Sequence, residues 1–223
     1  MCHVPLHASR EFTGRTKSKF GDVIEELDWS VGELLKAVKD LGLDDSTLVI
    51  FTTDNGAASG SSQPLRGKKA SLFEGGIRVP CVMRWPGKIP AGKVCSEVAA
   101  TIDVLPTLAK LAGAEVSKER KIDGKDIWPL MRGAADARSP HEAYVLAHST
   151  GAVRSGKWKY YPPSAKQKLP MLYDLAADLA ETTDVADKNP EMVAKLQKAY
   201  EALLADLKAN SRPSAAMTPP EQK

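Results

Sequence analysis

The stretch from residue 20 to residue 53 constrains the fold more than any other part of the sequence. Apolar residues recur every three to four positions from Phe20 to Leu41, which predicts an amphipathic helix, and Gly42 is a typical helix stop. A polar turn follows, and residues 47–53 then form a continuous, β-branched apolar run that is typical of a buried parallel strand. Because a helix, a short turn and a buried strand make an α/β unit, we predict an α/β fold.

Residues with metal-binding side chains follow this strand directly, in the sequence Asp54-Asn55-Gly56. In open α/β sheets, ligands bind just beyond the carboxyl ends of the strands. The carboxylate of Asp54 and the amide oxygen of Asn55 are hard donors that suit Ca²⁺ or Mg²⁺. The same tripeptide is also a strong turn former, so an Asx turn without a ligand is the alternative interpretation.

A polar, glycine-containing loop ends at Lys68 and Lys69 and could hold an anion, because backbone amides near glycines approach one easily. A solvated basic loop is the alternative. His3 and His7 have the spacing of two ligands on a helix, but Pro5 between them argues against a helix and a zinc site. A single histidine near an anion could protonate a leaving group. A hard metal beside an anion site suits hydrolysis of a phosphate or sulfate ester, and these residues do not decide between the two.

The sequence changes character after about residue 138. Before it, we predict a further strand at residues 79–85 and short helices at 103–113 and 126–131. After it, short β-rich pieces alternate with glycine and proline, which is typical of an antiparallel sheet. These pieces cover residues 143–147, 152–154 and 158–161. Residues 190–209 then predict an amphipathic helix.

Composition excludes two classes of partner and leaves the cysteines open. The net charge of +3 comes from acids and bases mixed along the chain, so nucleic-acid binding is not predicted. No apolar run approaches the roughly 20 residues of a membrane span. Cys2, Cys81 and Cys95 have no metal-type spacing. The last two either pair in an oxidising compartment or are buried free thiols.

Ten short segments occur in an order that a known family shares. They are His3–His7, Gly21–Gly32, Thr53–Ala57, Leu65–Lys69, Phe73–Pro80, Trp85–Gly92, Ile102–Thr107, Ile122–Asp126, Arg154–Lys159 and Leu172–Leu175. In these segments the chain resembles the sulfatase family of the alkaline-phosphatase superfamily. The resemblance covers nearly the whole chain. Any one segment is weak evidence, but ten segments in the family's order are specific.

The resemblance implies an alkaline-phosphatase-like fold, with a mostly parallel sheet and flanking helices, and a small C-terminal antiparallel-sheet subdomain with a packed helix. Residues 1–135 would be the C-terminal portion of the catalytic α/β domain. Residues 140–210 would be the small α+β subdomain. Residues 211–223, which are polar and proline-rich, are predicted to be a disordered tail.

The resemblance also implies a role for individual residues. Asp54 and Asn55 would be two ligands of a Ca²⁺ ion, which is preferred to Mg²⁺. Lys69 matches the lysine that holds the sulfate group, judged by its distance in sequence from Glu74. Lys68 stands where the family usually has glycine, so the choice between the two lysines stays open. His3 matches the histidine that faces the sulfate and the leaving-group oxygen.

One feature of the family has no counterpart in this sequence. Family members carry a Cys-x-Pro-Ser-Arg-like motif whose cysteine or serine becomes the formylglycine nucleophile, and none of the three cysteines sits in such a motif. We therefore expect a C-terminal fragment of a sulfatase, with the modified residue on a segment upstream of Met1. The chain alone should be inactive, because removing the nucleophile from a covalent mechanism costs orders of magnitude in rate.

The resemblance further implies a sulfated small molecule or sulfated glycan as substrate and a formylglycine-generating enzyme as maturation partner of the full-length protein. That protein would be periplasmic or secreted, although residues 1–7 do not resemble a signal peptide. Two other functions stay open: a phosphodiesterase or phosphonate-ester hydrolase of the same superfamily, and a non-catalytic truncated or degenerate domain.

Overall fold

The computed structural model describes residues 5–116, 119, 121–146 and 151–211 of the chain. The backbone divides into two compact units, Met1–Ile50 with Met83–Gly92 and Phe51–Val82 with Lys93–Lys223. These borders differ from the predicted division near residues 135–140, which stays a prediction. The predicted tail lies outside the described residues apart from Ser211.

The first unit contains the long helix α1, Lys19–Asp40, which confirms the helix predicted from Phe20 to Leu41. Ser18 caps its first turn by accepting a hydrogen bond from the amide of Gly21. Only Val23 of the predicted apolar stripe is fully buried, where it packs with Ala8 and Phe12. Other stripe residues face solvent in this chain, with exposed fractions of 40% for Phe20, 42% for Ile24 and 68% for Leu34.

The predicted strand at 47–53 is present as β1, Val49–Thr52, and it pairs with β2, Cys81–Arg84. Its predicted burial is wrong for this chain, because all four residues are half-buried or exposed. Among the described residues only β2 pairs with β1. The mostly parallel sheet stays a prediction.

The start of β1 is fixed within the first unit by side chains from the end of β2. Two guanidinium nitrogens of Arg84 donate to the two carboxylate oxygens of Asp44, at 2.6 and 2.7 Å. The indole nitrogen of Trp85 donates to the carbonyl of Asp45 at 2.8 Å. Bidentate pairing of this kind adds orientation as well as attraction. Asp44 and Asp45 belong to the 3₁₀ turn η1, Asp44–Ser46.

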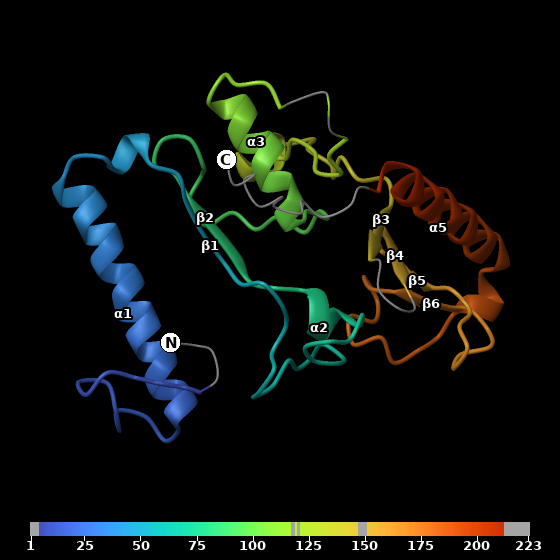
Figure 1. The fold of residues 1–223 in the computed structure, drawn as a ribbon, viewed down its shortest axis with the longest axis horizontal. Coiled ribbons are helices and arrows are strands. Elements are labelled where there is room, and N and C mark those ends of the chain that lie inside the picture. The colour runs from blue at the N-terminus through green and yellow to red at the C-terminus, as the bar shows by residue number, and fades with distance from the viewer. Residues whose placement is uncertain (1–4, 117–118, 120, 147–150, 212–223) are drawn as a thin grey trace, which may run out of the picture. The chain divides into compact units, whose positions relative to one another are not determined.

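The second unit contains the predicted antiparallel sheet, with strand order β3-β4-β5-β6 (Figure 1). The strands are β3 Tyr144–Leu146, β4 Ala152–Ser155, β5 Trp158–Tyr161 and β6 Met171–Asp174. Helix α5, Pro190–Asn210, packs across this sheet and confirms the helix predicted at 190–209.

The two faces of this sheet are covered by different elements. Successive residues of a strand point to opposite faces, so Tyr160 and Tyr161 belong to different clusters. Tyr160 packs with Leu196 of α5 on one face. Tyr161 packs on the other face with Leu72 and Phe73, which lie just before the short helix α2, Glu74–Ile77. The sheet therefore supports the segment that carries Lys69.

Two further elements of the second unit match the short helices predicted for its middle part. They are α3, Val104–Leu111, and α4, Trp128–Met131. The 3₁₀ turn η2, Thr101–Asp103, leads into α3, and the 3₁₀ turn η3, Ala186–Lys188, precedes α5. The fully buried carboxylate of Asp103 accepts from the amides of Ala100 and Lys125 and lies 2.8 Å from Nε2 of His141. Within the described residues, no helix is long and apolar enough to cross a membrane.

Candidate functional site

Asp54 and Asn55 lie immediately after β1, where their position in the sequence predicted them. Asp54 is exposed and Asn55 is half-buried. The side-chain amide of Asn55 donates to Oδ2 of Asp54, and the hydroxyl of Thr53 donates to Oδ1 at 3.3 Å. The two side chains therefore lie together, and the carbonyl oxygen of the Asn55 amide is left as an acceptor.

The turn that contains Asp54 and Asn55 is fastened to the loop that contains Lys69. The amide of Gly56 donates to the carbonyl of Gly76 at 2.9 Å, and the amide of Lys69 donates to the carbonyl of Ala57 at 3.1 Å. A Cβ at Gly56 would lie 2.0 Å from the carbonyl oxygen of Gly75, so only glycine permits this approach. The backbone thus brings two of the predicted segments together.

Segment 66–77 is itself a tight loop built on glycines. The amide of Gly75 donates to the carbonyl of Arg66 at 2.7 Å, which closes the loop at its base. A Cβ at Gly75 would lie 2.4 Å from the carbonyl oxygen of Gly67 and one at Gly76 would lie 2.2 Å from that of Ser71. The Glu-Gly-Gly sequence is therefore required by close packing of backbone against backbone.

Both candidate lysines of this loop are exposed to solvent. Lys68 and Lys69 are exposed, and neither ammonium group has a partner among the described residues. Ala70, the next residue, has a φ of +73°. This left-handed conformation costs a residue with a Cβ roughly 1–2 kcal/mol. The choice between Lys68 and Lys69 stays open.

The loop is anchored to the C-terminal sheet by charges that sequence analysis did not single out. The ammonium of Lys159 on β5 lies 2.8 Å from Oε1 of Glu74 and 3.4 Å from Oε1 of Glu181. All three residues are at most 5% exposed. Lys159 and Glu74 stand in segments shared with the known family, but nothing in the sequence pattern points to Glu181.

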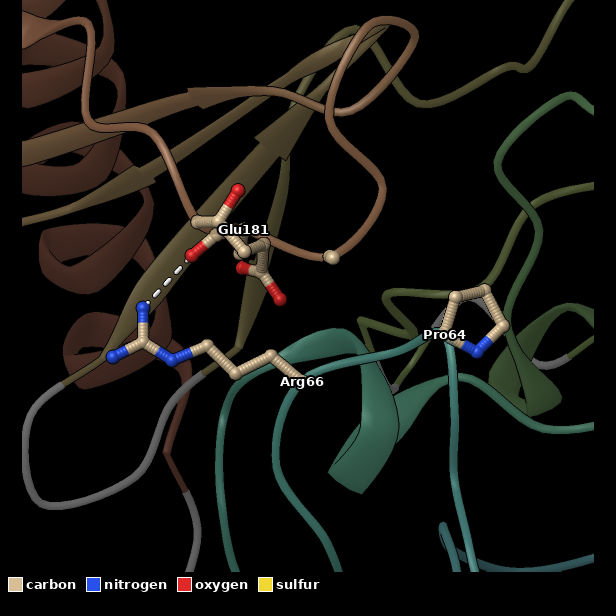
Figure 2. Close-up of a pocket in the computed structure, with 5 residues that line it drawn as sticks. Pro64, Arg66 and Glu181 are labelled. Carbon is tan, nitrogen blue, oxygen red and sulfur yellow. Dashed lines mark hydrogen bonds between the residues drawn. The ribbon is translucent and has the colours of Figure 1, made fainter.

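Arg66 adds a second contact at the same place, and Figure 2 shows its guanidinium directed toward the backbone of Glu181. Nη1 of Arg66 donates to the Glu181 carbonyl at 2.8 Å, and the guanidinium lies 3.9 Å from the centre of the Phe73 ring. An open depression of about 490 Å³ lies beside it, lined by Pro64, Arg66, Ala180, Glu181 and Thr182.

The remaining predicted residues are placed as follows. His3 and Cys2 lie outside the described residues. Cys81 and Cys95 are free and exposed, so they are neither paired nor buried as the two interpretations had it. Within the described part of the chain, no group of three or more His, Cys, Asp or Glu residues could hold a metal ion. A metal at Asp54 and Asn55 would therefore need ligands beyond those described.

Two family models match this chain. The model described as Sulfatase matches residues 2–114, and the model described as N-sulphoglucosamine sulphohydrolase, C-terminal, matches residues 68–210. The chain belongs to the sulfatase family. The sulfatase match and the C-terminal model together place it in the C-terminal part of a sulfatase, which confirms the resemblance.

Individual relatives of this sulfatase chain are named for different substrates. Mouse steryl-sulfatase is 41% identical over 168 residues, which cover 70% of this chain and 27% of the relative. Bovine arylsulfatase A is 35% identical over 235 residues, which cover 90% of this chain and 46% of the relative. The chain thus spans between about a quarter and a half of the length of these relatives.

Solved structures confirm an alkaline-phosphatase-like sulfatase fold. The structure of Ps i-CgsB in complex with k-i-k-neocarrahexaose has a TM-score of 0.81 and 30% identity, covering 95% of this chain and 49% of that one. The PsFucS1 sulfatase from Pseudoalteromonas sp. has a TM-score of 0.83 and 23% identity, covering 96% and 48%. The second likeness concerns the fold alone.

Proposed function

We propose that this chain forms the C-terminal part of the active site of a sulfuric-ester hydrolase whose formylglycine nucleophile lies on an upstream segment. The observation that carries the proposal is the pair of backbone hydrogen bonds that joins the Asp54–Ala57 turn to the loop of Lys69. These bonds hold a pair of oxygen donors next to a loop with two exposed lysines, in a chain of the sulfatase family. A metal-assisted hydrolase of an anionic ester needs both.

The residues present suit part of a calcium site. Asp54 offers a carboxylate and Asn55 an amide oxygen, which are the hard donors that Ca²⁺ takes, and it takes 6–8 of them at 2.3–2.6 Å. A bound Ca²⁺ would supply a positive charge that polarises the ester. Two residues provide too few ligands for tight binding, so we propose that the other ligands come from the upstream segment, with Ca²⁺ preferred to Mg²⁺.

Lys69 is proposed to hold the sulfate group. Its ammonium is exposed and lacks a partner among the described residues, so an incoming anion would not have to displace a carboxylate. Hydrogen bonds from the amide of Gly75 to the carbonyl of Arg66 and from the amide of Lys69 to the carbonyl of Ala57 hold the backbone of its loop. His3 is proposed to face the leaving-group oxygen and to give it a proton, which is the usual role of a histidine at such a place.

The exposed apolar surface of α1 supports the view that further polypeptide completes the domain. Phe20, Ile24 and Leu34 are between 40% and 68% exposed on the stripe that the sequence predicts as the inner face of an amphipathic helix. Burying one such side chain fully contributes about 1.5–3 kcal/mol. An upstream part of a sulfatase domain that packs on this stripe would recover that free energy.

The substrate is proposed to be a sulfated glycan or a sulfated small molecule. The matching structure at 30% identity holds a neocarrahexaose, whereas the relatives by sequence are named for steryl and aryl sulfates. A formylglycine-generating enzyme would mature the full-length protein, which we place in the periplasm or outside the cell. These assignments follow the family, and residues 51–82 do not distinguish between the substrates.

Turnover of para-nitrophenyl sulfate tests the proposal. We expect none from the 223-residue chain alone and clear turnover when it is joined to the N-terminal half of a related sulfatase and matured by a formylglycine-generating enzyme. In that protein, Asp54→Ala should lower turnover about 100-fold and raise the Ca²⁺ concentration needed. The matched control Asp136→Ala removes an exposed carboxylate and should change neither.

A second pair of variants decides between the two lysines. Lys69→Ala should lower turnover about 100-fold or more, as loss of a charge-stabilising group does, while Lys68→Ala should change it about twofold or less. The reverse result would keep the site and move the role to Lys68. Turnover by the 223-residue chain alone, abolished by a change in one of its own residues, would refute the proposal. A joined, matured and folded protein that never turns over would favour a non-catalytic domain.

A further inference from the structure

A buried group of charged side chains joins the loop of Lys69 to the C-terminal sheet. Glu74 stands at the start of α2, Lys159 lies on β5, and Glu181 lies in the connection after β6. Glu181 and Lys159 are fully buried, and Glu74 is 5% exposed. Charges are costly to bury unless they are paired and hydrogen-bonded, so this group has a specific arrangement that the surrounding structure must maintain.

Glu181 holds the loop at both of its ends. Its carbonyl accepts a hydrogen bond from Nη1 of Arg66 at 2.8 Å, at the beginning of the loop (Figure 2). Its carboxylate oxygen Oε2 accepts from the amide of Glu74 at 2.6 Å, at the end of the loop. Lys69 lies between these two anchor points. One residue of the C-terminal subdomain therefore clamps the segment that carries the candidate sulfate-binding lysine.

The other carboxylate oxygen of Glu181 is held by two neighbours on β5. The hydroxyl of Tyr161 donates to Oε1 at 2.6 Å, and the ammonium of Lys159 lies 3.4 Å from the same oxygen. Burial, followed by the neighbouring carboxylate of Glu181, raises the pKa of Tyr161, so its hydroxyl stays protonated and donates. Lys159 also lies 2.8 Å from Oε1 of Glu74 and balances both carboxylates.

The backbone of Glu181 carries strain that these contacts offset. Its φ is +53°, in the left-handed region that residues with a Cβ rarely adopt. Such conformations persist when the surrounding contacts determine them, and they concentrate at functional sites. Here the carbonyl and the carboxylate of the same residue are both in use, because the carbonyl accepts from Arg66 and the carboxylate accepts from the amide of Glu74.

We propose that Glu181, whose charge is balanced by Lys159, is a positioning residue for the 66–77 loop. This proposal rests on the proposed function of Asp54, Asn55 and Lys69. The coupling runs from Glu181 through Glu74 to the carbonyl of Gly76, which accepts from the amide of Gly56. It also runs along the loop to the amide of Lys69. Glu181 and Lys159 would act through the backbone and side chain of Glu74. Leu72 and Phe73 already attach the loop to the sheet by apolar packing, which is not directional. The charged contacts of Glu181 and Lys159 are directional, so they would determine the orientation of the loop.

Backbone amide exchange and amide chemical shifts of the 223-residue chain test the proposal. Glu181→Gln keeps the length of the side chain and removes its charge. We expect the amides of Gly56 and Lys69 to exchange at least about tenfold faster and to shift, while the amides of β4 and β5 keep their rates. Lys157→Met serves as a control, because it breaks an exposed ion pair with Asp174 on the same sheet and should leave both amides unchanged.

The possible results have distinct meanings. Faster exchange spread evenly over the sheet and the loop would show an ordinary loss of stability and overturn the positioning role, and so would unchanged amides at Gly56 and Lys69. If Glu181→Gln does not fold, Tyr161→Phe removes a single donor to the same carboxylate and is read in the same way. Local exchange changes combined with full turnover of both the Lys69→Ala and the Lys68→Ala variants of the joined, matured protein would overturn the proposed function while leaving the coupling from Glu181 to the loop.

Discussion

Replacing Lys159 by methionine should destabilise the second unit far more than replacing any exposed lysine. The side chain of Lys159 is 0% exposed and lies within 3.4 Å of two carboxylates, Glu74 and Glu181. Lys159→Met keeps most of the apolar volume and leaves two buried carboxylates without their nearest cation. Removing one partner of a buried pair costs about 3–5 kcal/mol, because the other charge stays buried without compensation.

Nearby arginines place the expected loss at the lower end of that range. Arg78 lies 3.7 Å from Oε2 of Glu74. Burial lowers the pKa of Arg154, while the negative charges of Glu74 and Glu181 act in the opposite direction. We therefore expect about 3 kcal/mol, a large part of the 5–15 kcal/mol that stabilises a typical domain. With a urea dependence of about 2 kcal/mol per molar, the midpoint of unfolding should fall by roughly 1.5 M.

Urea unfolding followed by far-ultraviolet circular dichroism measures this loss. The control Lys157→Met removes a lysine that is 51% exposed and paired with Asp174 on the same sheet. Exposed pairs contribute about 0–1 kcal/mol, so this midpoint should move little. Equal, small shifts for Lys157→Met and Lys159→Met would refute the argument that the buried charges depend on one another.

Three further changes have expected outcomes. Hydrogen bonds from the amides of Gly14 and Thr16 lower the pKa of Asp22, so the stability that its carboxylate contributes is present above the unfolded pKa of 3.8 and is lost as the pH falls through the folded pKa. The urea midpoint of Asp22→Asn should therefore lie below that of the unchanged chain at pH 7, and the two midpoints should converge in acid. Gly56→Ala should cost about 1–3 kcal/mol and speed exchange of the Gly76-bonded amide, because its Cβ meets a backbone carbonyl. Ala70→Gly should raise the thermal midpoint slightly, by relieving a φ of +73°, with a gain of about 1 kcal/mol or less after the entropy of glycine is counted.

The elements that the sequence predicted well are those whose signal is local. The stripe from Phe20 to Leu41 spans many helical turns, and α1 begins and ends within one residue of it. The strands around Ala152 and Trp158 follow from β-branched and aromatic residues between glycines. The burial of β1 was not predictable in the same way, because burial depends on which other strands are present beside Phe51.

The residues of the candidate site likewise differ in whether a local sequence signal reveals them. Asp54 and Asn55 could be found from their place after a strand, and Lys69 from the order of short segments in the family. Glu181 could not be found, because its partner Glu74 is 107 residues away and the contact exists only after the sheet has formed. A buried ion pair leaves no periodic or positional trace in a single sequence.

The contacts that hold the 66–77 loop differ in how far apart their partners lie in the sequence. The contacts that shape the 66–77 loop from within, such as the bond from the Gly75 amide to the Arg66 carbonyl, are available before the C-terminal sheet forms. The contacts of Glu181 and Lys159 become available only when β5 and β6 have paired, because both residues depend on that part of the sheet. The local bonds therefore define the shape of the loop, and the long-range charges define where it is held. A change at Glu181 should leave the loop able to form but free to move relative to the sheet, whereas a change at Gly75 should prevent the loop from closing.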